Sequence, residues 1–388
     1  MSLFENTEIA FKLKSNNELR KAYALFKAVD KNWLTDLGAW SLPWAIHIPG
    51  VKSIMKATVF AQFCGGETRQ ESLQTVEQIY AQNVKSILDY SVEGKESEED
   101  YERCFNEIMA IIDIAQGNPM IPFVVFKPTG FGNIDIYTKV GAGEKLNANE
   151  EEQWNNIRRR FKAVCEKGYN KDVTIMIDAE ESWMQDAADD LAVEMMQLFN
   201  KERCIVMNTL QMYRHDRLAY LKNQAKRAKE GNYLLGYKVV RGAYMEKERE
   251  RAKVKGYPSP IQPNKASTDH DYNEAIQFIA ENKDRISLFA GTHNEQSCKL
   301  LMDYIDQNNV SKDDNHLWFG QLLGMSDNIS FVLGDKGYNI AKYVPYGPVK
   351  DVMPYLIRRA QENTSVAGQS SRELGLLHKE LKRRKLEN

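Results

Sequence analysis

The sequence predicts an α/β protein built as a (β/α)8 barrel. Short β-branched or apolar runs alternate with stretches that have the apolar spacing of amphipathic helices. The runs are almost continuously hydrophobic, which is typical of parallel strands covered by helices on both faces. Eight strand and helix units fit a closed barrel, and an open doubly wound sheet is the alternative. The eight runs occupy residues 83–93, 121–130, 172–180, 203–211, 234–242, 285–294, 316–324 and 339–347.

Polar side chains at the ends of these runs favour the barrel over the open sheet. A barrel brings the carboxyl ends of its strands into one ring, where such side chains converge on a single ligand. An open sheet would spread the same side chains along an edge. The residues concerned are Asp89, Lys127, Asp178, Glu180, Gln211, Arg241, His293, Asn294, Gln321 and Tyr346.

The two ends of the chain are predicted to be helical. Leu19, Tyr23 and Phe26 have helical spacing, so we expect residues 1–65 to form an N-terminal helical arm and residues 66–388 to form the barrel. Near the other end, Pro348 suits the first turn of a helix whose apolar face includes Val352.

Composition excludes several classes of protein. The 388 residues include 52 basic and 54 acidic side chains, so no overall field attracts nucleic acid, and we expect no nucleic-acid partner. The five cysteines are scattered and never spaced as C-x-x-C, which favours reduced thiols in a cytoplasmic location. The C-terminal stretch, residues 378–388, is locally basic; we interpret it as a solvated helix end, with contact to an anionic surface as the alternative.

Common cofactor and catalytic motifs are missing from the sequence. There is no G-x-G-x-x-G after a strand, no P-loop, no G-x-S-x-G elbow and no H-E-x-x-H. Any nucleotide cofactor would therefore be bound by the barrel itself. Three carboxylates in TIMIDAEESW could form a metal site or an acid and base pair, but no histidine has ligand spacing, so we expect no metal.

Two adjacent arginines, Arg358 and Arg359, lie in the predicted last helix. Tyr355 precedes them and Glu362 follows them, each by about one turn. One carboxylate cannot satisfy two planar guanidinium groups, so a buried pair retains donors for an external anion, and arginine suits bidentate binding of a carboxylate. The alternative is an exposed Arg–Glu pair that contributes roughly a few tenths of a kcal/mol.

Three other polar positions also have a functional and a plainer interpretation. Arg241 lies between an apolar run and a glycine, where a guanidinium can bind an anion or extend into solvent. His293 ends a predicted strand beside Asn294, although a single histidine is more often a hydrogen-bonded structural residue. Asp269 stands near the start of a predicted helix, where capping is its default role.

At this point the residues resemble a known family. Residues 319–365, which run from FGQLLG to RRAQENTS, closely resemble the C-terminal third of proline dehydrogenases, whose signature is a tyrosine, two arginines and a Glu-Asn pair on the last barrel helix. The segments SILDYSVE, MIDAEES, YKVVRGAYMEKER and GTHNEQS resemble strand segments of the same family. The resemblance covers roughly residues 55–370 and is closest to the single-function, mitochondrial-type enzymes.

The resemblance implies a distorted (β/α)8 barrel with FAD held non-covalently at the carboxyl ends of its strands and with the last helix over the barrel mouth. It implies that Arg358 and Arg359 bind the substrate carboxylate, that Glu362 orients them, and that Tyr343 and Tyr355 pack against the proline ring. Arg241 would lie by the reactive face of the flavin, and Asp269 matches an acidic residue near the flavin and the substrate pocket. Many bifunctional bacterial members have arginine where this chain has Gln321. The residues that match FAD-lining segments are Gln211, Arg241, Gly242, Ala243, Thr292, His293, Asn294 and Gln321.

The activity implied by the resemblance is FAD-dependent oxidation of L-proline to 1-pyrroline-5-carboxylate, the first step of proline catabolism. Electrons would pass to a quinone-type acceptor, which would place the protein peripherally at the inner face of a membrane. A separate pyrroline-5-carboxylate dehydrogenase would be a partner. The alternatives are a hydroxyproline dehydrogenase of the same family and a catalytically silent barrel that binds an amino acid.

Overall fold

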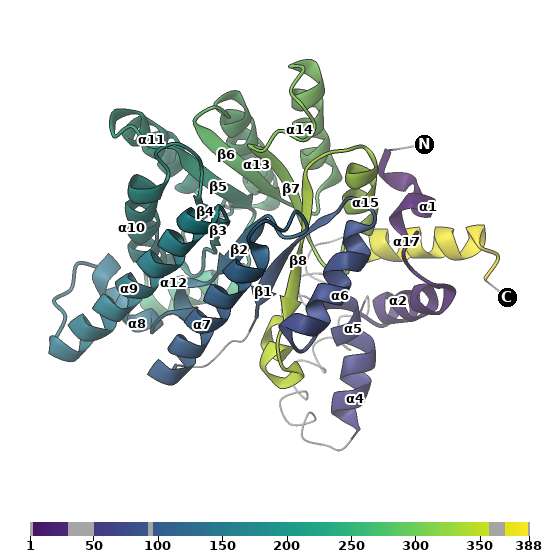
Figure 1. Ribbon diagram of the computed structural model, residues 1–388, viewed down its shortest axis with the longest axis horizontal. Coiled ribbons are helices and arrows are strands. Elements are labelled where there is room, and N and C mark those ends of the chain that lie inside the picture. Colours follow the sequence, from purple (N-terminus) through teal and green to yellow (C-terminus); the bar gives the residue numbers. More distant parts are fainter. Residues whose placement is uncertain (1–2, 30–49, 92–95, 357–368, 387–388) are drawn as a thin grey trace. The chain divides into compact units, whose positions relative to one another are not determined.

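Eight parallel strands form one closed barrel in chain order (Figure 1). The structure is a computed structural model that describes residues 3–29, 50–91, 96–356 and 369–386. Every strand lies within one of the predicted runs, so the barrel prediction is confirmed and the open sheet is excluded. The strands are β1 (Lys85–Tyr90), β2 (Phe123–Phe126), β3 (Thr174–Ile177), β4 (Val206–Gln211), β5 (Leu235–Val240), β6 (Ile286–Gly291), β7 (Leu317–Leu322) and β8 (Ile340–Tyr346).

The chain divides into two compact units. One unit comprises residues 1–94 and 321–388, and the other comprises residues 95–320. The predicted boundary near residue 65 stays a prediction. The described parts of the predicted N-terminal arm, 3–29 and 50–65, are largely helical.

In the unit of residues 95–320, β2 to β6 pair in parallel with their neighbours, and β6 pairs with β7. Every residue of β4 is buried, as expected for a strand with covered faces. The ring of Phe123 packs edge-on against the rings of Phe289 and Trp318, with centroid distances of 5.6 and 4.7 Å. Aromatic contacts among β2, β6 and β7 therefore contribute to the core of this unit.

Two helices of this unit, α9 and α13, begin where the sequence supplies capping side chains. Asn147 and Glu150 form a reciprocal capping box at the start of α9, and Asn264 accepts a hydrogen bond from the backbone nitrogen of Ser267 at the start of α13. The helices are α7 (Glu98–Ala115), the short η3 (Pro128–Gly130), α8 (Ile134–Gly141), α9 (Ala148–Lys171), α10 (Ser182–Phe199), α11 (Arg217–Glu230), α12 (Met245–Lys255), α13 (Lys265–Glu281) and α14 (Glu295–Gln307).

In the other unit, β1 and β8 pair in parallel from Lys85 opposite Ala341 to Tyr90 opposite Tyr346. Residues 349–356 are helical, as predicted for the start of the last barrel helix. The other helical elements are η1 (Leu3–Glu5), α1 (Thr7–Ala10), α2 (Asn16–Val29), α4 (Val51–Met55), η2 (Lys56–Phe60), α5 (Ala61–Phe63), α6 (Arg69–Tyr80), α15 (Asp327–Asp335) and α17 (Gln369–Arg383).

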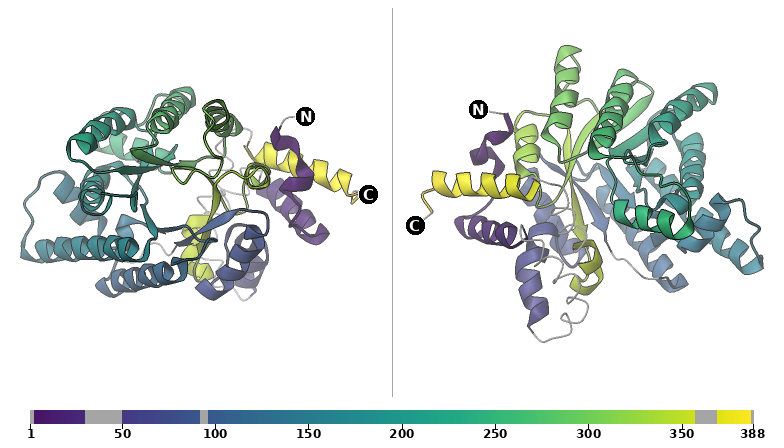
Figure 2. Two further views of the ribbon diagram at one scale, coloured as in Figure 1. Left: turned by 45° about the horizontal axis from the view of Figure 1, so that its top comes forward. Right: turned by 180° about the vertical axis from the view of Figure 1, so that it is seen from behind.

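The two ends of the chain pack on each other within this unit. Phe11 and Phe26 share one hydrophobic cluster with Leu377 and Leu381 of α17. Both views in Figure 2 show α17, in yellow, beside α1 and α2, in purple. Arg384 donates a hydrogen bond to the Phe11 carbonyl at 2.8 Å, so this residue of the basic tail binds the N-terminal segment instead of extending into solvent.

Some predictions fall outside the described residues. Residues 357–368 contain the predicted arginine pair, and the position of the last helix over the barrel mouth stays a prediction. In the described part of the chain, we find no helix with the length and apolarity that crossing a membrane requires.

Candidate functional site

Arg241, which directly follows β5, is held by hydrogen bonds from its guanidinium group to three side chains. Its Nε donates to Asp269 Oδ1 at 2.6 Å, its Nη1 to Thr292 Oγ1 at 2.7 Å and its Nη2 to Ser297 Oγ at 3.1 Å. The guanidinium also lies over the ring of Tyr272, 4.3 Å from its centroid. The structure thus brings together three of the predicted site residues, Arg241, Asp269 and Thr292, and fixes the plane of the arginine.

Asp269 lies inside α13 and binds two cations. Its second oxygen accepts a hydrogen bond from Lys265 at 2.5 Å. Partial burial raises the pKa of Asp269, but hydrogen bonds from Lys265 and Arg241 outweigh it and lower the pKa overall. The capping role expected for Asp269 is wrong, because Asn264 caps this helix. Asp269 therefore serves as an ionised partner that orients Arg241.

The segment after β6 contains the predicted residues Thr292, His293 and Asn294. The Asn294 side chain accepts hydrogen bonds from the backbone nitrogens of Gln296 and Ser297 at 2.9 and 3.1 Å and so caps α14. The backbone nitrogen of Asn294 donates to Thr292 Oγ1 at 3.1 Å. Thr292 therefore contacts both Arg241 and this turn, and Asn294 has a structural role in addition to any contact with a ligand.

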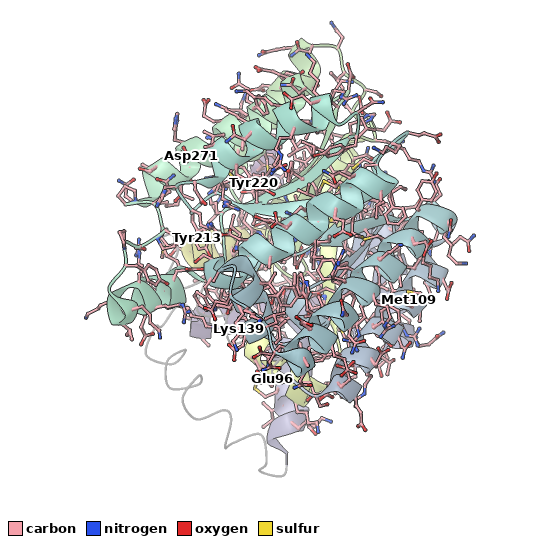
Figure 3. The ribbon with its side chains drawn as sticks, turned by 90° about the vertical axis from the view of Figure 1, so that its left-hand side faces the viewer. Glu96, Met109, Lys139, Tyr213, Tyr220 and Asp271 are labelled. Atoms are coloured by element: carbon pink, nitrogen blue, oxygen red, sulfur yellow. The ribbon has the colours of Figure 1, made fainter. Side chains whose placement is uncertain are left out.

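Gln211, at the end of β4, links two loops of the same unit. Its Nε2 donates to the Glu180 carbonyl at 2.6 Å, and its Oε1 accepts from the backbone nitrogen of Ala243 at 3.3 Å. Between Arg241 and Ala243, Gly242 has a φ of +131°, and a Cβ there would lie 2.5 Å from the ring of Tyr213, a residue labelled in Figure 3. Only glycine therefore fits this turn without displacing Tyr213.

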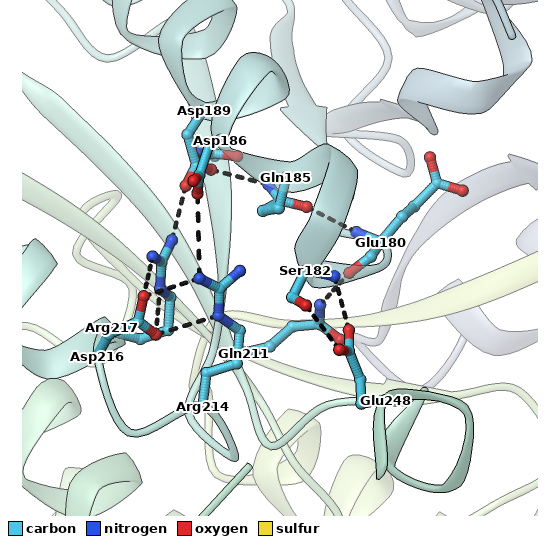
Figure 4. Close-up of polar contacts among 11 residues, drawn as sticks. Glu180, Ser182, Gln185, Asp186, Asp189, Gln211, Arg214, Asp216, Arg217 and Glu248 are labelled. Atoms are coloured by element: carbon cyan, nitrogen blue, oxygen red, sulfur yellow. Dashed lines mark hydrogen bonds and ion pairs between the residues drawn. The ribbon is translucent and has the colours of Figure 1, made fainter. Parts of the chain in front are cut away.

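Glu180, in the loop after β3, takes part through its backbone in the polar contacts drawn in Figure 4. Its carboxylate accepts hydrogen bonds from the backbone nitrogen and Oγ1 of Thr129 at 2.8 and 2.6 Å, and its backbone nitrogen donates to Gln185 Oε1 at 2.8 Å. Burial, followed by the neighbouring Glu181 carboxylate, raises the pKa of Glu180 to about 7. Hydrogen bonds from Thr129 and the charge of Lys127 act in the opposite direction.

The loop around Glu180 is anchored from two further elements. Gln185 Nε2 donates to the buried Asp189 at 2.8 Å, and Asp189 also accepts a hydrogen bond from Arg217 at 2.7 Å (Figure 4). On the other side, the carboxylate of Glu248 in α12 accepts hydrogen bonds from the backbone nitrogen and the hydroxyl of Ser182, both at 2.6 Å. These bonds hold Glu180 and Gln211 in one arrangement.

Lys238 in the middle of β5 is a site residue that sequence reasoning missed. Its ammonium group forms an ion pair with Asp178, and Lys127 lies 3.8 Å from the other oxygen of the same carboxylate. All three side chains are largely buried, and Asp178 and Lys127 are strand-end residues that the sequence had indicated. The available signal was a single charge inside an otherwise apolar strand.

The three carboxylates that were considered for a metal site contact different partners. Asp178 pairs with Lys238, Glu180 binds Thr129, and Glu181 pairs with Lys247 of α12. Within residues 3–29, 50–91, 96–356 and 369–386, no group of three or more His, Cys, Asp or Glu side chains is arranged to hold a metal ion.

The remaining predicted site residues belong to the unit of residues 1–94 and 321–388. Gln321 is buried, and its Oε1 accepts a hydrogen bond from Ser330 of α15 at 2.9 Å. Tyr343 in β8 is 8% exposed, and Tyr355 in the last helix is 5% exposed and joins the hydrophobic cluster of this unit. Arg358, Arg359 and Glu362 lie outside the described residues.

Comparison with known proteins identifies the family. A family model described as proline dehydrogenase matches residues 72–372. The chain is 35% identical over 323 residues to the carbapenem antibiotics biosynthesis protein CarD of Pectobacterium carotovorum subsp. carotovorum, covering 83% of each chain. It is 40% identical over 245 residues to proline dehydrogenase 1, mitochondrial, of Drosophila melanogaster, covering 61% of this chain and 36% of that protein. It is 29% identical over 412 residues to hydroxyproline dehydrogenase of Xenopus laevis, covering 96% of this chain and 88% of that protein.

A solved structure shares the fold. The crystal structure of proline utilization A (PutA) from Bdellovibrio bacteriovorus, inactivated by N-propargylglycine, matches with a TM-score of 0.71 at 22% identity and covers 94% of this chain. This chain spans 37% of that chain. Because the family model matches residues 72–372, which are most of the chain, the chain belongs to the proline dehydrogenase family, a family of oxidoreductases of proline catabolism.

Proposed function

We propose that this chain oxidises L-proline to 1-pyrroline-5-carboxylate with FAD and passes the electrons to a quinone-type acceptor. The observation that carries the proposal is Arg241, which is fixed after β5 by Asp269 and Thr292 in a chain whose residues 72–372 match the proline dehydrogenase model. A cation held rigidly at a strand end suits an electron-rich ligand whose charge changes during the reaction.

The residues around Arg241 fit FAD. Arg241, Lys127 and Lys238 supply cationic donors for the acceptor atoms of a flavin and its pyrophosphate, and Gly242 lets the backbone approach a ligand closely. Gln211, Ala243, Thr292, His293, Asn294 and Gln321 are proposed as further contacts. When bound, FAD supplies the acceptor for the hydride. The protein would orient the bound FAD.

The substrate contacts are proposed from the family resemblance. Arg358 and Arg359 bind the carboxylate of proline, and Glu362 fixes their orientation. Their positive field lowers the pKa of the substrate amine, which must be neutral because a protonated nitrogen has no lone pair with which to form the imine. Tyr343 and Tyr355, both largely buried, pack against the ring and orient the carbon beside the nitrogen for hydride transfer.

An anaerobic absorbance spectrum tests this proposal. The purified protein is expected to be yellow, and its flavin band is expected to bleach when L-proline is added without oxygen. Folded protein without flavin would rule out the cofactor assignment. Bound flavin that L-proline does not reduce would rule out the substrate assignment and favour a catalytically silent barrel.

Hydroxyproline is a second candidate substrate because the relative from Xenopus laevis is named hydroxyproline dehydrogenase. The aromatic ring of Tyr343 leaves little room for an added ring hydroxyl, so we favour proline. Measuring kcat/KM for both substrates decides between them. A higher kcat/KM for hydroxyproline would identify hydroxyproline as the preferred substrate instead of proline.

We propose a cytoplasmic location with peripheral contact at the inner face of a membrane, since a quinone acceptor resides there. The relatives from Drosophila melanogaster and Arabidopsis thaliana are named as mitochondrial proline dehydrogenases. A separate pyrroline-5-carboxylate dehydrogenase is the proposed partner, because the cyclic imine hydrolyses to an aldehyde that a second oxidation must consume. Flotation with quinone-containing vesicles tests the membrane contact.

A further inference from the structure

Helix α17 contributes a buried carboxylate to the start of another helix. Glu373 is 5% exposed, and one of its oxygens accepts a hydrogen bond from the backbone nitrogen of Ser326 at 2.5 Å. Ser326 has a left-handed backbone, with a φ of +49°, directly before α15, and its own side chain does not cap that helix. A carboxylate at a helix N-terminus is stabilised by the orphan N–H groups there. Glu373 therefore holds a turn in which a serine has an unfavourable backbone conformation.

A fully buried lysine connects this turn to β8. Lys342 has no exposed surface, and its ammonium group lies 2.9 Å from Asp327, the first residue of α15. The same ammonium donates hydrogen bonds to the carbonyl oxygens of Met325 and Leu322 at 2.8 and 3.3 Å. Burying an ammonium group costs much free energy unless such partners are in place. The position of the turn therefore determines where Lys342 can lie.

Lys342 directly precedes Tyr343 in β8, and neighbouring side chains of a strand point to opposite faces. The backbone carbonyl of Tyr343 accepts a hydrogen bond from the Leu323 nitrogen at 2.9 Å, so the turn contacts β8 at this residue as well. A displacement of the turn would move Lys342 on one face and the ring of Tyr343 on the other.

We propose that Glu373 is a positioning residue for substrate binding, acting through Ser326, Asp327 and Lys342 to hold Tyr343 of β8 in place. The inference rests on the proposed function, in which Tyr343 packs against the substrate ring. It assigns a role to α17, most of which lies beyond residues 72–372 that match the family model.

The charge of Glu373 changes near neutral pH. Burial, followed by the Asp327 carboxylate, raises the pKa of Glu373 to about 7, while the Ser326 hydrogen bond, Lys342 and Lys14 act to lower it. The charged groups facing Glu373 thus come from α15, β8 and the segment after α1, where Lys14 lies 3.8 Å from Asp327. A positioning role for Glu373 predicts that substrate affinity depends on this titration.

The experiment compares Glu373→Ala and Glu373→Gln with the wild type and with Glu77→Gln, a matched change at an exposed position of α6 in the same unit. In the FAD-loaded protein, Glu373→Ala is expected to raise the KM for proline about fivefold. Glu373→Gln is expected to match the wild-type KM at pH 6, where both side chains are neutral, and to differ from it about threefold or more at pH 8. Glu77→Gln should match the wild type at both pH values.

Two further measurements separate positioning from a purely structural role. In a Tyr343→Ala background, Glu373→Ala should cause no additional rise in KM, because both changes act on the same contact. Hydrogen exchange of the β8 peptide, which requires neither flavin nor turnover, should be faster in Glu373→Ala than in Glu77→Gln.

Each outcome has a definite meaning. Faster exchange with unchanged KM and an unchanged pH profile would show a purely structural glutamate and overturn the inference. Additive effects of the Glu373 and Tyr343 changes would overturn it as well. If Glu373→Ala does not fold, the nearly isosteric Glu373→Gln still gives the pH profile that decides. A wild-type protein that leaves proline unoxidised would refute the proposed function, and hydrogen exchange would still show whether Glu373 holds β8.

Discussion

Replacing Glu180 with glutamine should change how the stability of the protein depends on pH. The Glu180 carboxyl is buried and accepts two hydrogen bonds from Thr129, and its pKa is raised from an ordinary value of 4.5 to about 7. Glutamine keeps an acceptor for the Thr129 backbone nitrogen, and the Thr129 hydroxyl can rotate to accept from the new amide. The substitution therefore removes the charge and keeps the contacts.

The sign and size of the expected change in stability follow from the pKa shift of Glu180. Between pH of about 4.5 and about 7, the folded protein keeps the Glu180 proton that the unfolded chain has lost. The contribution of Glu180 to the unfolding free energy therefore falls as pH rises through this window, and it stays constant above the window. One pKa unit corresponds to about 1.4 kcal/mol, so the loss from Glu180 is on the order of 3 kcal/mol.

The assay is urea unfolding of the wild type, Glu180→Gln and Glu166→Gln at pH 5 and pH 8. Glu166 lies exposed in α9 of the same unit and provides the matched control. The stability of Glu180→Gln relative to the wild type should increase on the order of 3 kcal/mol from pH 5 to pH 8, and that of Glu166→Gln should stay constant. If the difference in unfolding free energy between Glu180→Gln and the wild type is the same at pH 5 and pH 8, the reasoning is refuted. Such a result would mean that the carboxyl has the same pKa in the folded and unfolded chains.

Three further substitutions test the site. Arg358→Met should raise the KM for proline about a hundredfold or more while flavin absorbance is retained, because the proposed charge-assisted bond to the substrate carboxylate is lost. An unchanged KM would remove the carboxylate assignment. Gly242→Ala should lower the fraction of protein that retains FAD after gel filtration. The alanine Cβ would meet the ring of Tyr213, and the backbone conformation at this position favours glycine. Full retention of FAD would show that the turn adapts. Asp269→Asn should lower kcat/KM about tenfold by weakening the orientation of Arg241. If stopped-flow measurements give the same rate of flavin reduction for Asp269→Asn and the wild type, Asp269 has a solely structural role.

The sequence was sufficient to predict the strands because buried parallel strands leave continuous apolar runs. The family resemblance was sufficient to group Arg241 with Thr292, which a hydrogen bond joins in the structure. The sequence did not reveal Lys238, because a lysine inside a strand gives no sign of the Asp178 carboxylate that neutralises it. The capping interpretation of Asp269 was wrong for a local reason: Asn264, five positions earlier, has the capping side chain and starts the helix sooner.

Contacts between distant parts of the chain were beyond sequence reasoning. The basic tail suggested a solvated helix end, yet Arg384 binds backbone carbonyls of Phe11 and Lys14, more than 360 positions earlier. Likewise, nothing near Glu373 in the sequence indicates that Ser326 will need its carboxylate. Tertiary packing determines such partners, and neither hydrophobic periodicity nor motif spacing predicts how distant segments pack.

The pairing of the first helices with α17 has a consequence for biosynthesis. Phe11 and Phe26 leave the ribosome long before Leu377 and Leu381, which complete their hydrophobic cluster. At a synthesis rate of about 5–20 residues per second, the apolar face of the emerging N-terminus stays uncovered for roughly twenty seconds or more. The nascent chain is therefore a natural client for chaperones until α17 has been translated, and a premature stop codon before α17 would release a product prone to aggregation.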